Sequence, residues 1–501
     1  MITVIIEKNA YDKMNTRTQI KTLKELKESG YKIQSIKSEL RSNLIQNIKN
    51  KKSSFTGIHG YENSVIPQLE RAILSQHNIN LLGLRGQAKT RLARLMVQLL
   101  DEFIPIIEGS EINDDPLAPI SAFGKDQIIK FGDETPIKWL HRDERFFEKL
   151  ATPDVTISDL IGDIDPIKAA NLKLNYSDER VIHYGMIPRA NRCIFVINEL
   201  PDLQARIQVA LFNILEEGDV QIRGFQLRMP LDLQFVFTAN PEDYTNRGSI
   251  VTPLKDRIGS QILTHYPKTL EIAKTITAQE ARLQGDRICK IHIPALAKDF
   301  VEQISFEARK SEYIDSKSGI SARMSITAYE NLLSTAEHRC ITSGAKETSI
   351  RFSDVLGMIP SITGKIELVY EGEQEGASFV AEILIGNAAK TLFLNYFPKI
   401  KKLTKEGEVD TYDAIMNWFF EETSFELMDD GSEDEYSEAL KSIEPLDDLI
   451  QNYASDIALK DVPFMKELVL WALVEYKKLN KHRIENGYAF KDQYGSYLSN
   501  L

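Results

Sequence analysis

Cysteine and histidine, the residues that build disulfides and zinc centres, are scarce in this chain. Among 501 residues there are 3 cysteines and 8 histidines. Cys193, Cys289 and Cys340 lie far apart with no metal-ligand spacing, and the histidines form no HExxH or other paired motif. The elbow motif of a serine hydrolase is also missing. These absences argue against a disulfide-built fold, a zinc enzyme and a serine hydrolase, and they suit a reducing cytoplasm.

Long hydrophobic runs are missing as well. No apolar stretch approaches the roughly 20 residues that cross a bilayer. The first residues, MITVIIEKNAYDKMN, lack the basic-then-apolar order of a signal peptide. The net charge of −12 argues against a general nucleic-acid binder. We therefore expect no membrane insertion and no nucleic-acid partner.

Charge is unevenly distributed along the chain. Residues 1–54 hold twelve Lys and Arg against five Asp and Glu, in a helical pattern. We interpret them as a solvated helical arm that packs on an acidic partner surface. A nucleic-acid or membrane contact is the alternative, which the near absence of aromatic residues for stacking disfavours. Residues 405–448 are strongly acidic, which predicts an exposed linker.

Between these ends, strand and helix patterns alternate, as is typical of a parallel α/β core. Buried strands are expected in INLLG, CIFVINEL and LDLQFVFTAN, and amphipathic helices follow the first two. VQIRGFQLRMP alternates around Gly224, which predicts a hairpin before the third strand. From residue 268 to about 358 the pattern is helical. After an alternating segment near 366–370, helices are again expected up to the C-terminus.

The first of these strands leads into LLGLRGQAKT, which is close to the phosphate-loop template G-x-x-x-x-G-K-[ST]. Gly83, Lys89 and Thr90 fit the template, whereas Ala88 replaces its last glycine. In such a loop the backbone N–H groups surround phosphates, the lysine reaches the β and γ oxygens, and the hydroxyl binds Mg²⁺. The predicted nucleotide-binding residues are Gly83, Arg85, Gly86, Gln87, Ala88, Lys89 and Thr90.

Polar residues end the next two strands. Asn198 and Glu199 follow CIFVI, and Asn240 follows LDLQFVFTA. Because ligands of open α/β sheets bind beyond the carboxyl ends of the strands, we expect these side chains beside the phosphates. There Asn198 could bind on the Mg²⁺ side of the phosphates, Glu199 could polarise the attacking water, and Asn240 could orient it. Phosphoryl transfer depends mainly on such positioning and on charge neutralisation. Asn240–Pro241 could equally be only a turn.

The ordered motifs resemble those of AAA+ ATPases, in particular the MoxR and magnesium-chelatase ATPase-subunit group. The resemblance extends from FTGIHGYENSVIPQLERAIL to about residue 340. LLGLRGQAKT resembles Walker A, CIFVINEL Walker B, FTANPED sensor 1, TPLKDRIGSQI the arginine-finger stretch, SARMSITAYENLL the sensor 2 helix, DLIGDIDPIKAA…HYGMIPRANR the helix-2 insert and VQIRGFQLRMP the hairpin before sensor 1. Residues after about 365 and the basic arm lie outside the resemblance.

The resemblance implies a P-loop AAA+ core with a parallel sheet, followed by a helical lid and a C-terminal α-rich module. The implied boundaries are 1–54 for the arm, 55–267 for the nucleotide-binding domain, 268–364 for the lid and 365–501 for the C-terminal module with its acidic linker near 405–448. ATP and Mg²⁺ are the implied cofactors, with Thr90 and Asn198 on the metal side. The implied assembly is a ring of six copies, and the implied partner is a separate protein with a von Willebrand A domain.

Four residues receive catalytic roles from the resemblance. Glu199 would be the catalytic carboxylate and Asn240 the sensor 1 residue. Arg257 would reach a neighbouring subunit's site as the arginine finger, and Arg323 the γ-phosphate of its own subunit. Taken alone, Arg257 could form a surface ion pair and Arg323 could be one more charge on a lid helix.

Two departures from the family pattern affect the site. Ala88 should be tolerated in Walker A if its φ is helical rather than left-handed. Asn198 replaces an aspartate of Walker B, so it retains one acceptor oxygen but loses the negative charge. Turnover could then be slow, and Asn198→Asp is expected to raise it unless the site has been rebuilt around the amide.

The predicted function is therefore an ATP-driven ring ATPase that remodels or activates a partner protein. Asn198 motivates an alternative, a nucleotide-dependent scaffold or switch that does not hydrolyse ATP. The ATPase subunit of a metal-chelatase complex is a narrower version of the first function. A sigma-54-type transcription activator fits less well, because the GAFTGA loop is missing.

Overall fold

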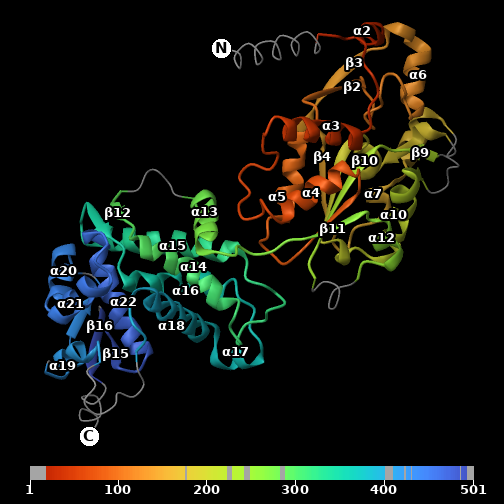
Figure 1. The fold of residues 1–501 in the computed structure, drawn as a ribbon. Helices are drawn as coiled ribbons and strands as arrows, with labels where there is room; N and C mark the ends of the chain where they lie inside the picture. Colours follow the sequence, from red (N-terminus) through yellow and green to blue (C-terminus); the bar gives the residue numbers. More distant parts are fainter. Residues whose placement is uncertain are drawn as a thin grey trace, which may run out of the picture. The chain divides into compact units, whose positions relative to one another are not determined.

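The computed structural model describes residues 19–174, 178–222, 228–241, 249–282, 288–400, 410–421, 425–429, 431–485 and 487–492. The chain divides into two compact units, Met1–His265 and Tyr266–Leu501. Figure 1 shows the strands of the first unit gathered into a sheet, and the second unit built mainly of helices. Each unit is described by itself.

The first unit is organised around a parallel five-stranded sheet. The strand order is β11-β1-β10-β7-β4, and all four neighbouring pairs are parallel. Because all five strands are parallel, their carboxyl ends lie at the same edge of the sheet, and crossover connections join them. The strands are β1 (Ile79–Leu82), β4 (Phe146–Leu150), β7 (Cys193–Asn198), β10 (Leu233–Ala239) and β11 (Ser260–Leu263).

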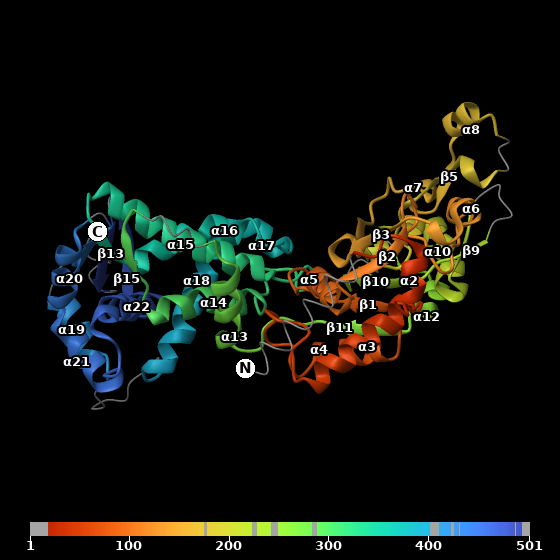
Figure 2. The same cartoon turned by 90° about the horizontal axis from the view of Figure 1, so that it is seen from above.

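Both faces of the central strands β1, β7 and β10 are buried, which explains why these strands are mostly apolar. In β7, Phe195 and Ile197 belong to one hydrophobic cluster, whereas Ile194 and Val196 belong to another. Helix α10 packs in the first cluster, and α3, α4 and α5 pack in the second; Figure 2 shows α3 and α4 along one side of the sheet. The helices of this unit are α2 (Leu23–Glu28), α3 (Ile36–Lys49), α4 (Val65–Leu74), α5 (Lys89–Leu95), α6 (Ala122–Phe131), α7 (Ile157–Leu160), α8 (Pro166–Leu172), α9 (Met186–Arg189), α10 (Ala205–Glu217) and α12 (Thr252–Arg257).

The basic N-terminal segment contributes to this core. Leu40 and Leu44 of α3 are fully buried in the cluster beneath the sheet. Glu39 of the same helix forms a buried, two-pronged ion pair with Arg145, with both N–O distances at 2.7 Å. The described part of the arm is therefore a layer of the first unit rather than a solvated helix, because the apolar face of α3 is covered by its own chain.

The first unit also contains three short antiparallel pairs of strands outside the parallel sheet. The pair β5 (Gly162–Ile164) and β6 (Ile182–Tyr184) flanks α8 and forms the expected helix-2 insert. The pair β8 (Asp219–Gln221) and β9 (Arg228–Pro230) forms the expected hairpin before β10, and Gly224 lies outside the described residues. The third pair is β2 (Phe103–Ile107) with β3 (Ile137–His141). The predicted fold class, a P-loop α/β core with these insertions, is confirmed.

The second unit is helical with small sheets at its margin. Its helices are α13 (Leu270–Glu280), α14 (Ala295–Ala308), α15 (Ala322–Thr342), α16 (Ile359–Thr363), α17 (Tyr370–Glu375), α18 (Ala377–Tyr396), α19 (Asp413–Glu421), α20 (Glu433–Lys441), α21 (Glu444–Tyr453) and α22 (Val462–Glu475). Its strands are β12 (Lys290–His292), β13 (Glu347–Ser349), β14 (Phe425–Met428), β15 (Leu479–Ile484) and β16 (Gly487–Asp492). One hydrophobic cluster includes residues from α14 to β16, so the expected lid and C-terminal module share a core.

Helix α18 shows why composition alone misleads here. It is the one helix in the described residues long and apolar enough to cross a membrane, so the expectation that no such stretch exists was wrong. Half of its most apolar 18-residue window is nevertheless buried within the unit, where it packs beside α14 and α22. Helix α22 lies in the same core, and it has ten consecutive buried residues from Phe464 to Leu473.

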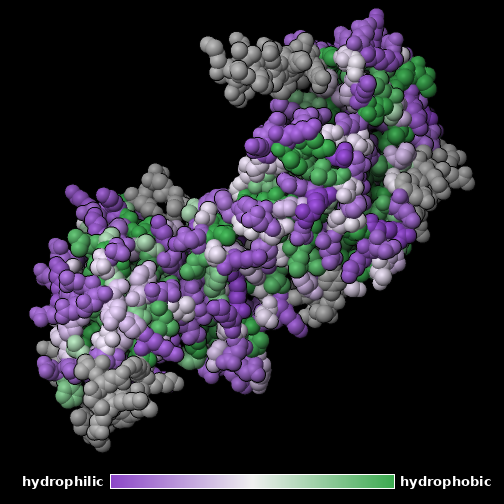
Figure 3. Space-filling model, viewed as in Figure 1, coloured by the Kyte–Doolittle hydropathy of each residue, from purple (hydrophilic) through white to green (hydrophobic). Residues whose placement is uncertain are grey.

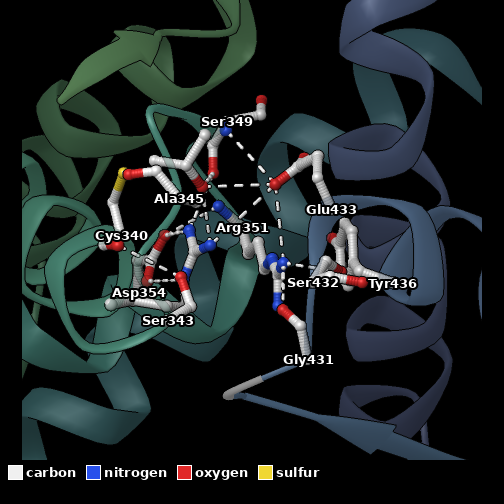
Figure 4. Close-up of polar contacts among 12 residues, drawn as sticks. Cys340, Ser343, Ala345, Ser349, Arg351, Asp354, Gly431, Ser432, Glu433 and Tyr436 are labelled. Atoms are coloured by element: carbon white, nitrogen blue, oxygen red, sulfur yellow. Dashed lines mark hydrogen bonds and ion pairs between the residues drawn. The ribbon is translucent and has the colours of Figure 1, made fainter.

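The acidic stretch differs from the expected exposed linker, because its residues 431–436 contact the buried Arg351. Glu433 lies 3.5 Å from the Arg351 guanidinium and accepts a hydrogen bond from Thr348 Oγ1 at 3.2 Å. Arg351 also donates to the Gly431 carbonyl at 2.7 Å and stacks on the ring of Tyr436 (Figure 4). Fixed opposite charges and backbone acceptors thus offset the cost of ordering so acidic a segment.

The alternating residues near 366–370 do not form a strand. Leu368 makes an isolated bridge to Ile314, and α17 begins at Tyr370.

The surface of both units mixes hydrophilic and hydrophobic residues on the face shown in Figure 3. On the first unit, α6 exposes Phe123, Ile129 and Phe131.

Candidate functional site

The loop after β1 has the geometry of a phosphate cradle. Strand β1 ends at Leu82 and α5 begins at Lys89, so the loop spans residues 83–88. A Cβ on Gly83 would collide with the side chains of Thr264 and Gln87, so only glycine fits there. Gly86 has φ +73°, which favours glycine as well. Arg85 and Gly86 are exposed at the tip of the loop.

Ala88 does not meet the condition under which its replacement of glycine was expected to be harmless. Its φ is +55° and its ψ is +21°, which is the left-handed region. In this region an L-residue with a Cβ is strained, because Cβ approaches the following carbonyl oxygen. The loop therefore retains the glycine conformation at residue 88 while carrying a side chain.

Lys89 connects the loop to the polar ends of two other strands. It is buried, and its Nζ donates to the carbonyl oxygens of Gly83 and Leu84 and to Asn240 Oδ1 at 2.6 Å. Asn240 Nδ2 in turn donates to Glu199 Oε2 at 2.8 Å. The structure thus brings the predicted ammonium, amide and carboxylate into one chain of contacts at the edge of the sheet.

Asn198 forms a second network beside the first. Its Oδ1 accepts hydrogen bonds from Thr238 Oγ1 at 3.0 Å and from Thr90 Oγ1 at 3.5 Å. Its Nδ2 donates to Glu148 Oε1 at 2.5 Å. Glu199, the next residue, has φ +55° and is held by its N–H, which donates to Thr238 Oγ1 at 3.2 Å. A strained backbone of this kind is common where a catalytic side chain must be aimed.

Sequence reasoning missed several residues that support the loop. Tyr61 Oη lies 3.0 Å from the Gln87 carbonyl and 2.7 Å from the His265 carbonyl, and Thr264 Oγ1 donates to Gln87 Oε1 at 2.7 Å. Burial raises the pKa of Tyr61 to about 12, so its hydroxyl remains a donor. No motif marks these residues, because Tyr61 lies just before α4 and Thr264 just after β11, and both reach the loop only in the folded chain.

The side chains present fit a nucleotide and a hard cation. A buried ammonium, a glycine-dependent loop and the start of a helix suit phosphate. The oxygens of Thr90 and Asn198 are the ligand type that Mg²⁺ prefers, and Mg²⁺ would supply neutralisation of phosphate charge. Among the described residues no group of three or more His, Cys, Asp or Glu could hold a metal ion.

Residues 137–258 match the family model of the AAA domain, dynein-related subfamily. This chain carries an AAA domain. The match covers β3 to the end of α12, and the strand order of the sheet and the loop of residues 83–88 complete the AAA+ core around it. Members of this family are ATPases, so a nucleotide-dependent function follows for the chain.

Solved structures with a similar fold include proteins of several kinds. NtrX from Brucella abortus is 14% identical over 59% of this chain, which spans 55% of the length of NtrX, with a TM-score of 0.33. A complex of the magnesium-chelatase subunits BchI and BchD is 18% identical over 64% of this chain and 98% of its own, with a TM-score of 0.34. A RuvB variant from Thermotoga maritima is 11% identical over 93% of both chains, with a TM-score of 0.33. These scores are below 0.5, and the assignment rests on the family match and the site geometry.

The AAA domain also contains Arg257, the last residue of α12. Its guanidinium forms an ion pair with Glu216 at 2.7 Å, donates to the Pro253 carbonyl at 2.9 Å and lies over the Phe212 ring. The Glu216 side chain is 58% exposed, so this surface pair contributes little to stability and breaking it costs little. Its role as an arginine finger stays a prediction.

Arg323 belongs to the second unit. It is exposed in the first turn of α15, where its N–H donates to the N-cap Ser321 Oγ at 3.2 Å. Its assignment as the sensor 2 residue also stays a prediction. The AAA residues that the structure itself brings together are those of the loop, Asn198, Glu199 and Asn240.

Proposed function

We propose that this chain is an ATP-driven AAA+ ring ATPase of the MoxR and magnesium-chelatase type, which remodels or activates a partner protein. The carrying observation is the contact chain Lys89–Asn240–Glu199 at the edge of the sheet. Lys89 would bind the β and γ phosphates, and Asn240 would sense the γ-phosphate while it positions Glu199. Glu199 would accept a proton from the attacking water.

The proposed partner is a separate protein with a von Willebrand A domain, and the proposed assembly is a hexameric ring in the cytoplasm. The ordered motifs and the helix-2 insert support the group assignment. In such a ring Arg257 would complete a neighbouring site. Its weak contact with Glu216 would allow this without unfolding α12.

The test compares wild type with Lys89→Ala and Glu199→Gln. Lys89→Ala should lose ATP binding, because the ammonium is the charge of the loop that faces the phosphates. Glu199→Gln should bind ATP normally but hydrolyse it at least about 100-fold more slowly, since it removes the proton acceptor. Titration with a fluorescent ATP analogue and a coupled phosphate-release assay measure the two quantities. Unchanged affinity in Lys89→Ala would refute the phosphate-loop assignment.

A second function, a nucleotide-dependent scaffold or switch that does not hydrolyse ATP, is favoured by one observation. Asn198 puts a neutral amide where Walker B has a carboxylate, and its Oδ1 is 3.5 Å from Thr90 Oγ1. If wild type and Glu199→Gln release phosphate at the same background rate while both bind ATP, the scaffold is the function. A role as the ATPase subunit of a metal chelatase would use the same catalytic residues, and its test would need the other subunits of the complex.

A further inference from the structure

The amide of Asn198 has a fixed orientation in the structure. Thr90 and Thr238 supply hydroxyl groups on one side of it, at 3.5 and 3.0 Å from Oδ1, and Glu148 lies on the other side. An ionised carboxylate only accepts hydrogen bonds, so at 2.5 Å it must face the NH₂ group rather than the amide oxygen. Glu148 therefore determines that the oxygen of Asn198 points towards Thr90.

Glu148 is itself held in place. It belongs to β4, which pairs with β7 so that Glu148 is opposite Val196 and Leu150 is opposite Asn198. Arg94 of α5 donates to Glu148 Oε2 from Nε at 3.1 Å and from Nη2 at 2.7 Å. The Glu148 side chain is 24% exposed and that of Arg94 63% exposed, so water screens the arginine more than the carboxylate.

A carboxylate on the neighbouring strand therefore lies one hydrogen bond away from residue 198, the position at which Walker B has its aspartate. A negative charge on the acceptor of Nδ2 polarises the amide and makes its oxygen more negative, because linked hydrogen bonds strengthen one another. The oxygen next to Thr90 then behaves more like a carboxylate oxygen than an isolated amide would. Outer partners of this kind raise the basicity of the groups that they contact.

We propose that Glu148 supplies, through Asn198, the negative charge that the aspartate of Walker B supplies elsewhere. Glu148 is thus a positioning residue for the Mg²⁺ side of the site, and this inference rests on the proposed function. It also reverses the expectation for Asn198→Asp. An aspartate at 198 would place a second carboxylate against Glu148, so the single substitution should weaken Mg²⁺ handling.

The experiment is a charge exchange between the two positions. The variants are Glu148→Gln, Asn198→Asp and the double variant. Glu148→Gln removes the charge and leaves one acceptor oxygen for two donors, Asn198 Nδ2 and the Arg94 guanidinium. The double variant restores one carboxylate, now at residue 198, with a glutamine amide able to donate to it. Glu134→Gln, which neutralises an exposed carboxylate of the same unit, is the matched control.

The readout is the affinity for mant-ATP, titrated with Mg²⁺ and repeated in EDTA. Glu148→Gln should raise the half-saturating Mg²⁺ concentration by about 10-fold or more. Asn198→Asp should raise it as well, and the double variant should return it close to the wild-type value. The control Glu134→Gln should keep the wild-type affinity in EDTA and the wild-type Mg²⁺ dependence, and the thermal midpoint of each variant shows whether it is folded. If Asn198→Asp does not fold, Glu148→Gln and the double variant decide the question.

Two results would overturn the inference. One is a wild-type Mg²⁺ dependence in Glu148→Gln, which would mean that Glu148 acts only through its shape. The other is a double variant worse than Glu148→Gln alone, which would mean that the two positions do not share one charge. Failure of the proposed function looks different, since wild type would then bind no mant-ATP in either condition.

Discussion

Replacing Ala88 by glycine should stabilise the protein, although the substitution shortens a side chain in a loop that packs against a core. Ala88 has φ +55°, a conformation that costs an L-residue roughly 1–2 kcal/mol and glycine almost nothing. Glycine loses roughly 0.4–1 kcal/mol more chain entropy on folding. Ala88 is partly buried, so the loss of its methyl group costs less than the roughly 0.8 kcal/mol of a fully buried one.

The net expectation for Ala88→Gly is a gain of about 0.5 kcal/mol, or a rise of roughly 1–2 °C in the thermal midpoint of a unit of this size. Differential scanning calorimetry without nucleotide measures it. Ala93→Gly, in the middle of α5 and fully buried, is the matched control. It should lose about 2 kcal/mol, because a helix-interior glycine costs about 1 kcal/mol and the buried methyl group nearly as much again. If Ala88→Gly destabilises as Ala93→Gly does, residue 88 is not left-handed and the reasoning fails.

Two further predictions concern buried charge and assembly. Glu467 is fully buried and accepts hydrogen bonds from Tyr436 Oη at 2.6 Å and from the Phe352 N–H at 2.8 Å, and burial raises its pKa to about 7. Because the pKa of Glu467 is higher in the folded than in the unfolded state, the free energy of unfolding falls as pH rises from about 4.5 through 7, by up to roughly 3 kcal/mol. In urea unfolding, Glu467→Gln should therefore be more stable than wild type at pH 8 but hardly so at pH 5. The exposed control Glu444→Gln should show no such difference between the two pH values. Arg257→Ala should leave the mant-ATP affinity of dilute subunits unchanged but weaken the ring that forms with an ATP analogue and Mg²⁺, as measured by sedimentation. Lys255→Ala, on the same helix, should assemble like wild type. Equal assembly by both variants would show that Arg257 does not contribute to the site of the neighbouring subunit.

Much of the nucleotide site was predictable because it depends on local chemistry. Strands buried on both faces appear as apolar runs, and their carboxyl ends share an edge whatever the loops do, so Lys89, Glu199 and Asn240 could be placed together in advance. The hairpin before β10 and the helix-2 insert followed from their motifs in the same way. The periodicity of α14 and α15 likewise fixed two helices of the second unit.

Only the tertiary structure decided the rest, since it depends on which distant residues meet. The backbone angles of Ala88 follow from the closure of a loop between β1 and α5, not from the alanine itself. Glu148 carries no motif, and it becomes relevant to Asn198 only because β4 pairs with β7. The acidic stretch looked too charged to order, yet it meets Arg351, which is 1% exposed and more than 75 residues away in sequence. A charge is costly or stabilising according to its partner, and partners of this kind are assigned by packing rather than by sequence pattern.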